Sequence, residues 1–378
     1  MKIGNNQSSI KRTPYFDKLR IIATIAVVTI HCCGKDTLSV GSFDWNVINA
    51  YNCLVQWAVP VFVMISGALY LGRDISFQKL FRKSILRIGT VFLFWSVLYA
   101  LWRCFVTHEK HGAKAVLLTV IKGNFHMWFL FMIAGLYLIV PIVNKIVESK
   151  KIAGYFVILS FLFSFLFPQM INVIGLKSTM LSNLANDFIS KFHVELVLGY
   201  SGYFVLGYLI NQTLIGKKTE YIIYALGLCS TAATVFGTVW LSSTNRPATV
   251  FSDELTVNIL LTSAAVFVFA KQHLNKPVKN DRSASALVFA SKCTLGIYMV
   301  HPLILDSLKR FAGITNLTFN PLVCVPMLVL SVFVLSFAVS AVINRIPLLG
   351  KWIVWSALRS IIIVLTECQI INRYESRR

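Results

Sequence analysis

Apolar runs of about 20 residues, separated by short charged connections, recur along almost the whole chain. A run of this length is what an α-helix needs to cross the hydrocarbon core of a bilayer, which is ~30 Å thick. The runs lie at residues 16–34, 47–71, 84–104, 126–144, 152–170, 195–211, 221–241, 255–270, 286–307 and 321–343. They predict an all-α integral membrane protein with about ten transmembrane helices. Residues 1–350 would form one membrane domain, followed by a cytoplasmic or interfacial tail at 351–378.

The basic residues predict an orientation for these helices. Loops on the cytoplasmic side of a membrane usually carry the excess of lysine and arginine. The N-terminal segment, the 72–87 connection, the 271–292 connection and the C-terminal tail are rich in both, and an even number of spans places them on one side. Both termini would then be cytoplasmic, in a multi-pass protein of the cell membrane. The predicted outer connection 103–125 is unusually basic for its side.

Several classes of function are not favoured by the sequence. The net charge of +21 belongs to the connecting loops, so we predict the lipid bilayer as a partner and no nucleic acid. The eight cysteines contain no Cys-x-x-Cys pair, which argues against a thiolate metal site. Phosphate-binding loops, serine-hydrolase elbows and His-Glu-x-x-His pairs are all missing. We therefore predict no metal and no permanently bound cofactor.

The first apolar run contains ionisable residues, which are costly inside a bilayer and so indicate function or a structural partner. Arg20 and His31 are eleven residues apart, which puts them on one helix face within about 20° and ~16 Å apart along the axis. Asp17 lies one turn before Arg20, close enough to pair with it. A neutral imidazole at His31 could take a proton from a hydroxyl as a general base. The alternative is a hydrogen bond between helices.

Two further groups of polar residues are candidates for a site. The first lies at the predicted depth of His31 and would suit acceptor binding and proton handling, although each member alone fits a helix-end contact. Its members are His126, Trp128, Glu195, Tyr298 and His301. The second lies before the third run and could bind the phosphates of a nucleotide-containing donor, or serve as a topology signal that contacts anionic lipids. Its members are Lys79, Arg82, Lys83 and Arg87.

The order and spacing of several short motifs resemble the acyltransferase 3 family of integral membrane acyltransferases, over residues 13–350. The resemblance is strongest to members that lack a fused esterase-like domain and O-acetylate surface polysaccharides. The motifs are Phe16-Asp-Lys-Leu-Arg20 with His31, Val59-Pro-Val-Phe-Val-Met-Ile-Ser-Gly67, the basic run 79–87, His126-Met-Trp-Phe-Leu130 with Tyr137 and Pro141, Gly202-Tyr-Phe-Val-Leu-Gly-Tyr208, and Leu295-Gly-Ile-Tyr-Met-Val-His-Pro302.

The resemblance implies that residues 1–350 are a membrane acyltransferase domain that takes an acyl group from cytoplasmic acetyl-CoA or another acyl-CoA. The acceptor would be a hydroxyl of an extracytoplasmic surface polysaccharide or glycolipid, and polysaccharide-assembly enzymes would be partners. It also implies that Arg20 and His31 are the essential pair. One feature departs from the family, whose paired arginines before the third span are often Arg-x-x-Arg, because Arg82 and Arg87 are five residues apart.

Direct acyl transfer with His31 as general base, and Arg20 organising the donor, is our preferred mechanism. Extended pantetheine is on the order of the ~16 Å that separates Arg20 from His31, so CoA phosphates could stay at the basic cluster while the thioester reaches the histidine. Tyr298 or His301 could assist at the oxyanion or the sugar. The alternatives are an acyl-histidine intermediate, a transporter or flippase for a lipid-linked sugar, and a non-catalytic membrane sensing domain.

Overall fold

A computed structural model describes residues 13–34, 38–106, 112–176, 178–194, 197–242, 249–278, 280–346 and 353, with only the backbone described for Phe77, Lys79 and Lys83. Within these ranges all regular secondary structure is helical, as predicted. The first half contains α1 (Pro14–Cys32), α2 (Phe43–Leu54), α3 (Ala58–Tyr70), α4 (Phe77–Leu80), the π turn η1 (Phe81–Ile85), α5 (Leu86–Phe105), α6 (Ala113–Lys122), the 3-10 turn η2 (Phe125–Met127), α7 (Trp128–Leu138) and α8 (Val140–Val147). The second half contains α9 (Lys150–Ser160), the π turn η3 (Phe161–Leu166), α10 (Phe167–Gly175), α11 (Thr179–Ser190), α12 (Ser201–Gln212), α13 (Lys217–Leu241), α14 (Val257–His273), α15 (Asp281–Ala312) and α16 (Pro321–Arg345).

Seven helical segments are long and apolar enough to cross a membrane, judged by length and composition. They are Phe43–Tyr70, Leu86–Phe105, Ala113–Leu138, Lys150–Gly175, Lys217–Leu241, Asp281–Ala312 and Pro321–Arg345. The other three predicted spans correspond to α1, α12 and α14. The last two have only 12 and 17 residues, and α1 carries Asp17, Lys18 and Arg20 in its first two turns. The protein is therefore a multi-pass helical membrane protein, while the count of about ten stays a prediction.

Prolines break three of the runs that the sequence analysis treated as continuous helices. A proline has no N–H and its ring clashes with the carbonyl group four residues earlier, so it favours a helix start. Pro60 and Pro141 are the third residue of α3 and the second residue of α8, directly after interruptions at 55–57 and at Ile139. Pro168 is the second residue of α10 and follows the π turn η3. The predicted spans 47–71, 126–144 and 152–170 are therefore bent or broken.

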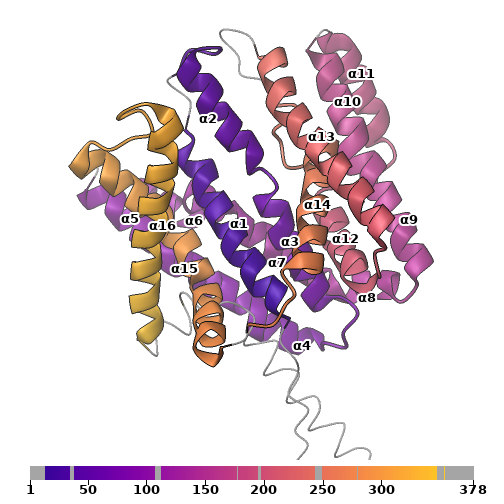
Figure 1. Ribbon diagram of the computed structural model, residues 1–378, viewed down its shortest axis with the longest axis horizontal. Coiled ribbons are helices and arrows are strands. Elements are labelled where there is room, and N and C mark those ends of the chain that lie inside the picture. Colours follow the sequence, from indigo (N-terminus) through magenta and orange to yellow (C-terminus); the bar gives the residue numbers. More distant parts are fainter. Residues whose placement is uncertain are drawn as a thin grey trace, which may run out of the picture.

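Two predicted connections contain helices of their own. The 103–125 connection holds α6, and the 171–194 connection holds the end of α10 and the whole of α11. The first turn of α11 is capped because the Ser178 hydroxyl accepts a hydrogen bond from the Leu181 amide at 3.3 Å. Helix α11 packs back onto α10, so this connection adds a second helix beside α10 at one edge of the bundle (Figure 1).

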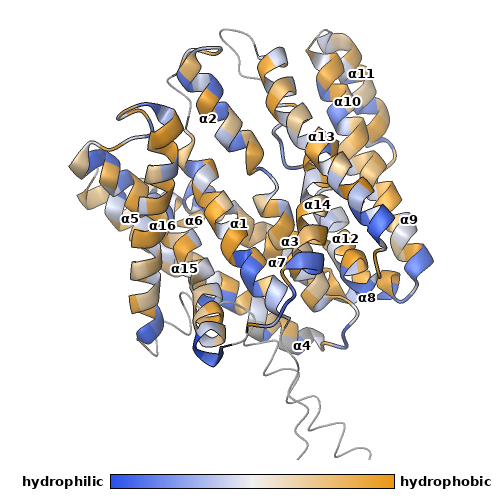
Figure 2. Ribbon diagram, viewed as in Figure 1, coloured by the Kyte–Doolittle hydropathy of each residue, from blue (hydrophilic) through white to orange (hydrophobic). Residues whose placement is uncertain are grey.

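Helix α1 runs through the middle of the bundle, where it packs against α3, α14, α15 and α16 (Figure 1). Hydrophobic residues cover most of the helix lengths and hydrophilic residues gather mainly at the helix ends (Figure 2). Near the beginning of α1, the Lys18 ammonium group donates to the carbonyl oxygens of Leu274 and Lys276, at 2.9 and 3.1 Å, just beyond α14. These bonds satisfy carbonyl groups that a helix end leaves unpaired, and they fix α1 relative to α14.

The predicted tail 351–378 lies outside the described residues except for Ile353. This residue is buried, and its carbonyl oxygen accepts a hydrogen bond of 3.2 Å from the indole N–H of Trp95 on α5.

Helices α3 and α12 approach so closely that their contact requires glycine. A Cβ atom on Gly67 would overlap the carbonyl oxygen of Phe204, and one on Gly207 would overlap the backbone of Met64. Small residues of this kind allow close backbone packing between membrane helices. The other face of α3 lines the cavity described below, so this contact also fixes the cavity wall.

We expect Gly67→Ala to destabilise the protein by ~1–3 kcal/mol or more, because the two helices must separate to admit one methyl group. The measurement is the melting temperature and monodispersity of the detergent-solubilised protein. Gly135→Ala on α7 is the matched control, since its Cβ would meet no atom within 4 Å and alanine favours a helix by ~0.5–1 kcal/mol. A Gly67→Ala protein as stable as the control would contradict the close packing.

Candidate active site

Three histidines from distant parts of the chain meet at one place. His31 is in the last turn of α1, His126 is in η2 and His301 is in α15. The centre of the His301 ring lies 5.0 Å from that of His31 and 5.6 Å from that of His126, so His301 is the central member. The structure therefore brings together three of the residues that the sequence analysis placed at a common depth. We call this group the histidine cluster.

The histidine cluster contains nitrogens that lack a protein partner. His126 and His301 are 1% and 0% exposed, whereas His31 is partly exposed. Three ring nitrogens have no hydrogen-bond partner among the described residues: Nδ1 and Nε2 of His126, and Nε2 of His301. Most buried polar groups in proteins are paired, so each unpaired one needs an explanation. The cluster has the donors and acceptors to bind a hydroxyl or a similar small polar group.

Tyr298 ties two elements of the cluster together. Its hydroxyl donates a hydrogen bond to the backbone carbonyl oxygen of His126. Its ring also lies 5.3 Å from the ring of His126 and 5.9 Å from that of His301, measured between ring centres. The tyrosine thereby holds η2 against α15. Its proton is engaged in this bond, so Tyr298 serves the predicted site by positioning His126.

Arg20 lies about three turns before His31 on the same helix and is paired with polar side chains. The Arg20 guanidinium is 3.8 Å from the carboxylate of Asp17, which confirms the predicted pairing. Asp17 in turn accepts a hydrogen bond of 2.6 Å from the Ser291 hydroxyl on α15. Both charged side chains are buried, at 9% and 2% exposed for Arg20 and Asp17. Through the Ser291 hydroxyl, this ion pair joins α1 to α15.

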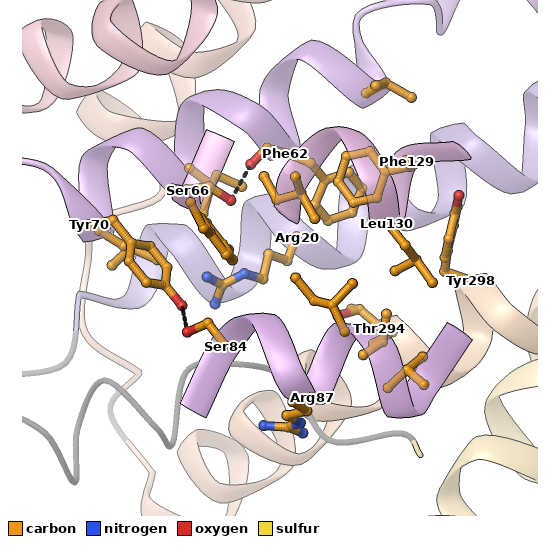
Figure 3. A pocket seen from close by; sticks show the side chains of 18 of the residues that line it. Arg20, Phe62, Ser66, Tyr70, Ser84, Arg87, Phe129, Leu130, Thr294 and Tyr298 are labelled. Carbon is orange, nitrogen blue, oxygen red and sulfur yellow. Dashed lines mark hydrogen bonds between the residues drawn. The ribbon is translucent and has the colours of Figure 1, made fainter. Parts of the chain in front are cut away.

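A cavity of about 150 Å³ lies between α1, α3, α5, α7 and α15, with η1 at one end. Figure 3 shows the Arg20 guanidinium directed toward Tyr70 and Ser84 at one end, and Tyr298 at the opposite end. The hydroxyl groups of Tyr70 and Ser84 are 3.1 Å apart and hydrogen-bonded. Most of the wall between the two ends is apolar, including Val27, Phe62, Ile65, Leu130 and Ile133. The cavity is thus polar and cationic at the Arg20 end and reaches the neighbourhood of the histidine cluster at the other.

The predicted basic cluster is divided between the cavity and the surface. Arg87 is 8% exposed and lines the cavity, whereas Arg82 is exposed. Arg82 is the second residue of the π turn η1 and Arg87 is the second residue of α5, and a π turn pairs residues five apart in place of four. The five-residue spacing of the two arginines therefore spans the junction of η1 and α5. The side chains of Lys79 and Lys83 lie outside the described part of the structure.

Trp128 has no described ring contact with the histidine cluster. Trp128 is 41% exposed, and its described ring contacts are with Phe129 and Tyr200, whose ring centres lie at 6.5 and 5.8 Å. Glu195 lies outside the described residues. Sequence analysis missed Tyr99, whose ring centre is 5.3 Å from that of His126 and whose hydroxyl donates to the Met299 carbonyl at 2.8 Å. A tyrosine near the outer end of the predicted span 84–104 was the signal available.

The chain belongs to the acyltransferase 3 family, because the family's acyltransferase domain matches residues 13–345. The match begins one residue before α1 and ends at the last residue of α16, so it covers the cavity and the histidine cluster together. Family and fold define a membrane acyltransferase. No curated protein and no solved structure matches the chain.

Proposed function

We propose that the protein transfers an acyl group, preferably acetyl, from cytoplasmic acyl-CoA to a hydroxyl of an extracytoplasmic surface polysaccharide or glycolipid. The observation that carries this proposal is the cavity, which is cationic at one end and at the other is lined by Tyr298, whose ring contacts those of His126 and His301. In a cell membrane with both chain termini in the cytoplasm, the Arg20 end faces inward. Polysaccharide-assembly enzymes would supply the acceptor as partners.

The donor is proposed to enter from the Arg20 end. Arg87 at the cavity wall and Arg82 on the adjacent surface provide guanidinium groups for the diphosphate and the 3′-phosphate, together with Lys79 and Lys83. The pantetheine arm then lies along the apolar wall. Eleven residues of helix between Arg20 and His31 rise ~16 Å, which is on the order of the extended arm. Arg20 holds the polar part of the arm, and the thioester reaches the histidine cluster.

The chemistry proposed at the cluster is direct transfer. His31 takes the proton of the acceptor hydroxyl as its oxygen forms a bond to the thioester carbon. An N–H group of His126 donates a hydrogen bond to the carbonyl oxygen, which becomes negative in the tetrahedral intermediate. The carbon–sulfur bond then breaks, and the thiolate receives the proton from His31 to give free CoA and the acyl ester. The acceptor sugar extends from the cluster toward Trp128, and Glu195 is a further candidate contact for it.

Sealed membrane vesicles of known orientation test the direction of transfer. We expect radiolabelled acetyl-CoA added outside inside-out vesicles to label an acceptor supplied within them, because the donor site then faces the added CoA. Right-side-out vesicles should give label only after permeabilisation, and vesicles without the protein provide the background. Labelling by intact right-side-out vesicles would contradict the proposed direction. Movement of a lipid-linked sugar without any acyl transfer would favour the transporter.

A further inference from the structure

The residue after His301 changes the hydrogen bonding of helix α15. Pro302 is inside the helix and has no N–H, so the carbonyl oxygen of Tyr298, four residues earlier, lacks its usual main-chain donor. Nδ1 of His301 lies 2.7 Å from this oxygen and 3.3 Å from the carbonyl oxygen of Ile297. A carbonyl oxygen can only accept, so Nδ1 must carry the hydrogen. The proline thus creates the acceptor that the imidazole satisfies.

This bond determines what the other nitrogen can do. A neutral imidazole with its hydrogen on Nδ1 has a lone pair on Nε2, which is an acceptor. Nε2 of His301 is buried and has no partner among the described residues. The ring of His301 contacts those of both His31 and His126, at 5.0 and 5.6 Å between ring centres. A hydrogen-bond acceptor of fixed orientation is therefore present at the centre of the histidine cluster.

We propose that His301 and Pro302 form a tautomer lock that orients His31: Nε2 of His301 accepts a hydrogen bond from one N–H of His31, and the other His31 nitrogen is thereby kept free as the base. This inference rests on the proposed function. His301 is then a positioning residue that does for His31 what a carboxylate does for histidine in a serine hydrolase. A neutral acceptor suits a bilayer-spanning helix, because burying an ionised carboxylate there is far more costly.

The hydrogen bond from His31 to Nε2 of His301 is proposed to form by rotation of the His31 side chain. His31 is partly exposed in the last turn of α1, whereas His301 is fixed by its bond to Tyr298. Hydrogen bonds of catalytic groups are often long or poorly aligned without substrate and tighten in the complex. When His31 takes the acceptor proton, its imidazolium gains a second N–H, and the first remains directed at Nε2 of His301. The lock thus supports the base both before and after proton transfer.

Two amide substitutions distinguish the structural role of Nδ1 of His301 from the acceptor role of Nε2. Asparagine places an amide near Nδ1, which keeps the bond to the Tyr298 carbonyl and removes the acceptor at Nε2. Glutamine places an amide near Nε2 and restores an acceptor there. We expect His301→Asn to lower kcat by ~10²–10⁴-fold, with the KM for acyl-CoA within about twofold of wild type. His301→Gln should be at least about tenfold faster than His301→Asn.

The opposite order would overturn the proposal. If His301 only stabilises α15, His301→Asn keeps the structural bond and will be as active as His301→Gln or more so. Comparable elution profiles and melting temperatures for both detergent-solubilised variants are required for the comparison. If wild-type protein shows no acyl transfer with any acyl-CoA, the proposed function fails. The tautomers of His31 and His301, measured by nuclear magnetic resonance, then still test the tautomer lock.

Nuclear magnetic resonance of protein with ¹⁵N-labelled histidine reads the tautomers without reference to activity. We expect His301 to show the Nδ1–H form and His31 a single tautomer. Pro302→Ala restores the N–H that competes for the Tyr298 carbonyl, so the Nε2–H form of His301 should appear. In His301→Asn, His31 should become a mixture of tautomers. A wild-type His301 with hydrogen on Nε2, or a His31 unaffected by His301→Asn, would refute the lock.

Discussion

Replacing His31 with alanine is expected to reduce kcat for acyl transfer by ~10²–10⁴-fold, the usual contribution of a general base. The donor phosphates and pantetheine are proposed to bind along the cavity, whose lining includes Arg20, Arg87 and the apolar wall but not His31. The KM for acyl-CoA should therefore stay within about twofold of wild type. The measurement is label transfer from radiolabelled acetyl-CoA to acceptor extract, in membranes that contain matched amounts of each protein.

His193→Asn is the control for this experiment. His193 is exposed in the connection before α12 and has a φ of 49°, a left-handed conformation that asparagine tolerates. The control also removes an imidazole, but at a position outside the histidine cluster, and should transfer label at the wild-type rate. Equal label incorporation by wild type and His31→Ala would exclude His31 as the base.

Filling the cavity should stop transfer as completely as removing the base. Ile133 is 5% exposed and forms part of the apolar wall of the cavity. A tryptophan there adds a bulky ring to a space of about 150 Å³, so the pantetheine arm cannot pass. We expect Ile133→Trp to lower kcat/KM for acetyl-CoA by at least ~100-fold, because small misplacements of reacting groups already cost this much.

Two variants separate blocking from misfolding. Phe131→Trp adds a tryptophan two residues away on α7, where the side chain is 55% exposed, and should retain activity. Ile133→Ala widens the cavity and should also transfer acetyl groups. Both variants and Ile133→Trp are compared for elution and melting temperature in detergent. A folded Ile133→Trp protein with wild-type activity would show that the donor reaches the histidines by another route.

The predictions from sequence were most reliable where a single helix determines the geometry. The spacing of Arg20 and His31 placed both on one face of α1, and the structure puts Arg20 at the polar end of the cavity and His31 in the cluster. The pairing of Asp17 with Arg20 was predicted for the same reason and is confirmed. Helical periodicity is local, so it can be read without knowledge of the packing.

The contacts between helices could not be predicted in this way. His126 and His301 are 175 positions apart, and only the tertiary arrangement shows that their rings are 5.6 Å apart. The breaks before Pro60 and Pro141 were readable, since proline lacks the donor that a continuous helix needs, but the sequence analysis relied on hydropathy, which does not register them. The π turn η1, which contains Arg82, has no comparable signal in the sequence.

The origin of the three histidines in α1, η2 and α15 also sets the order in which the site can form during synthesis. A nascent chain that ends before α15 already contains Arg20, the α3, α5 and α7 walls, and two histidines. It lacks Thr294, Leu295 and Tyr298, which close one side of the cavity, and His301. Chains synthesised from the N-terminus acquire these residues late. An incomplete chain in the membrane therefore lacks one wall of the cavity and the third histidine.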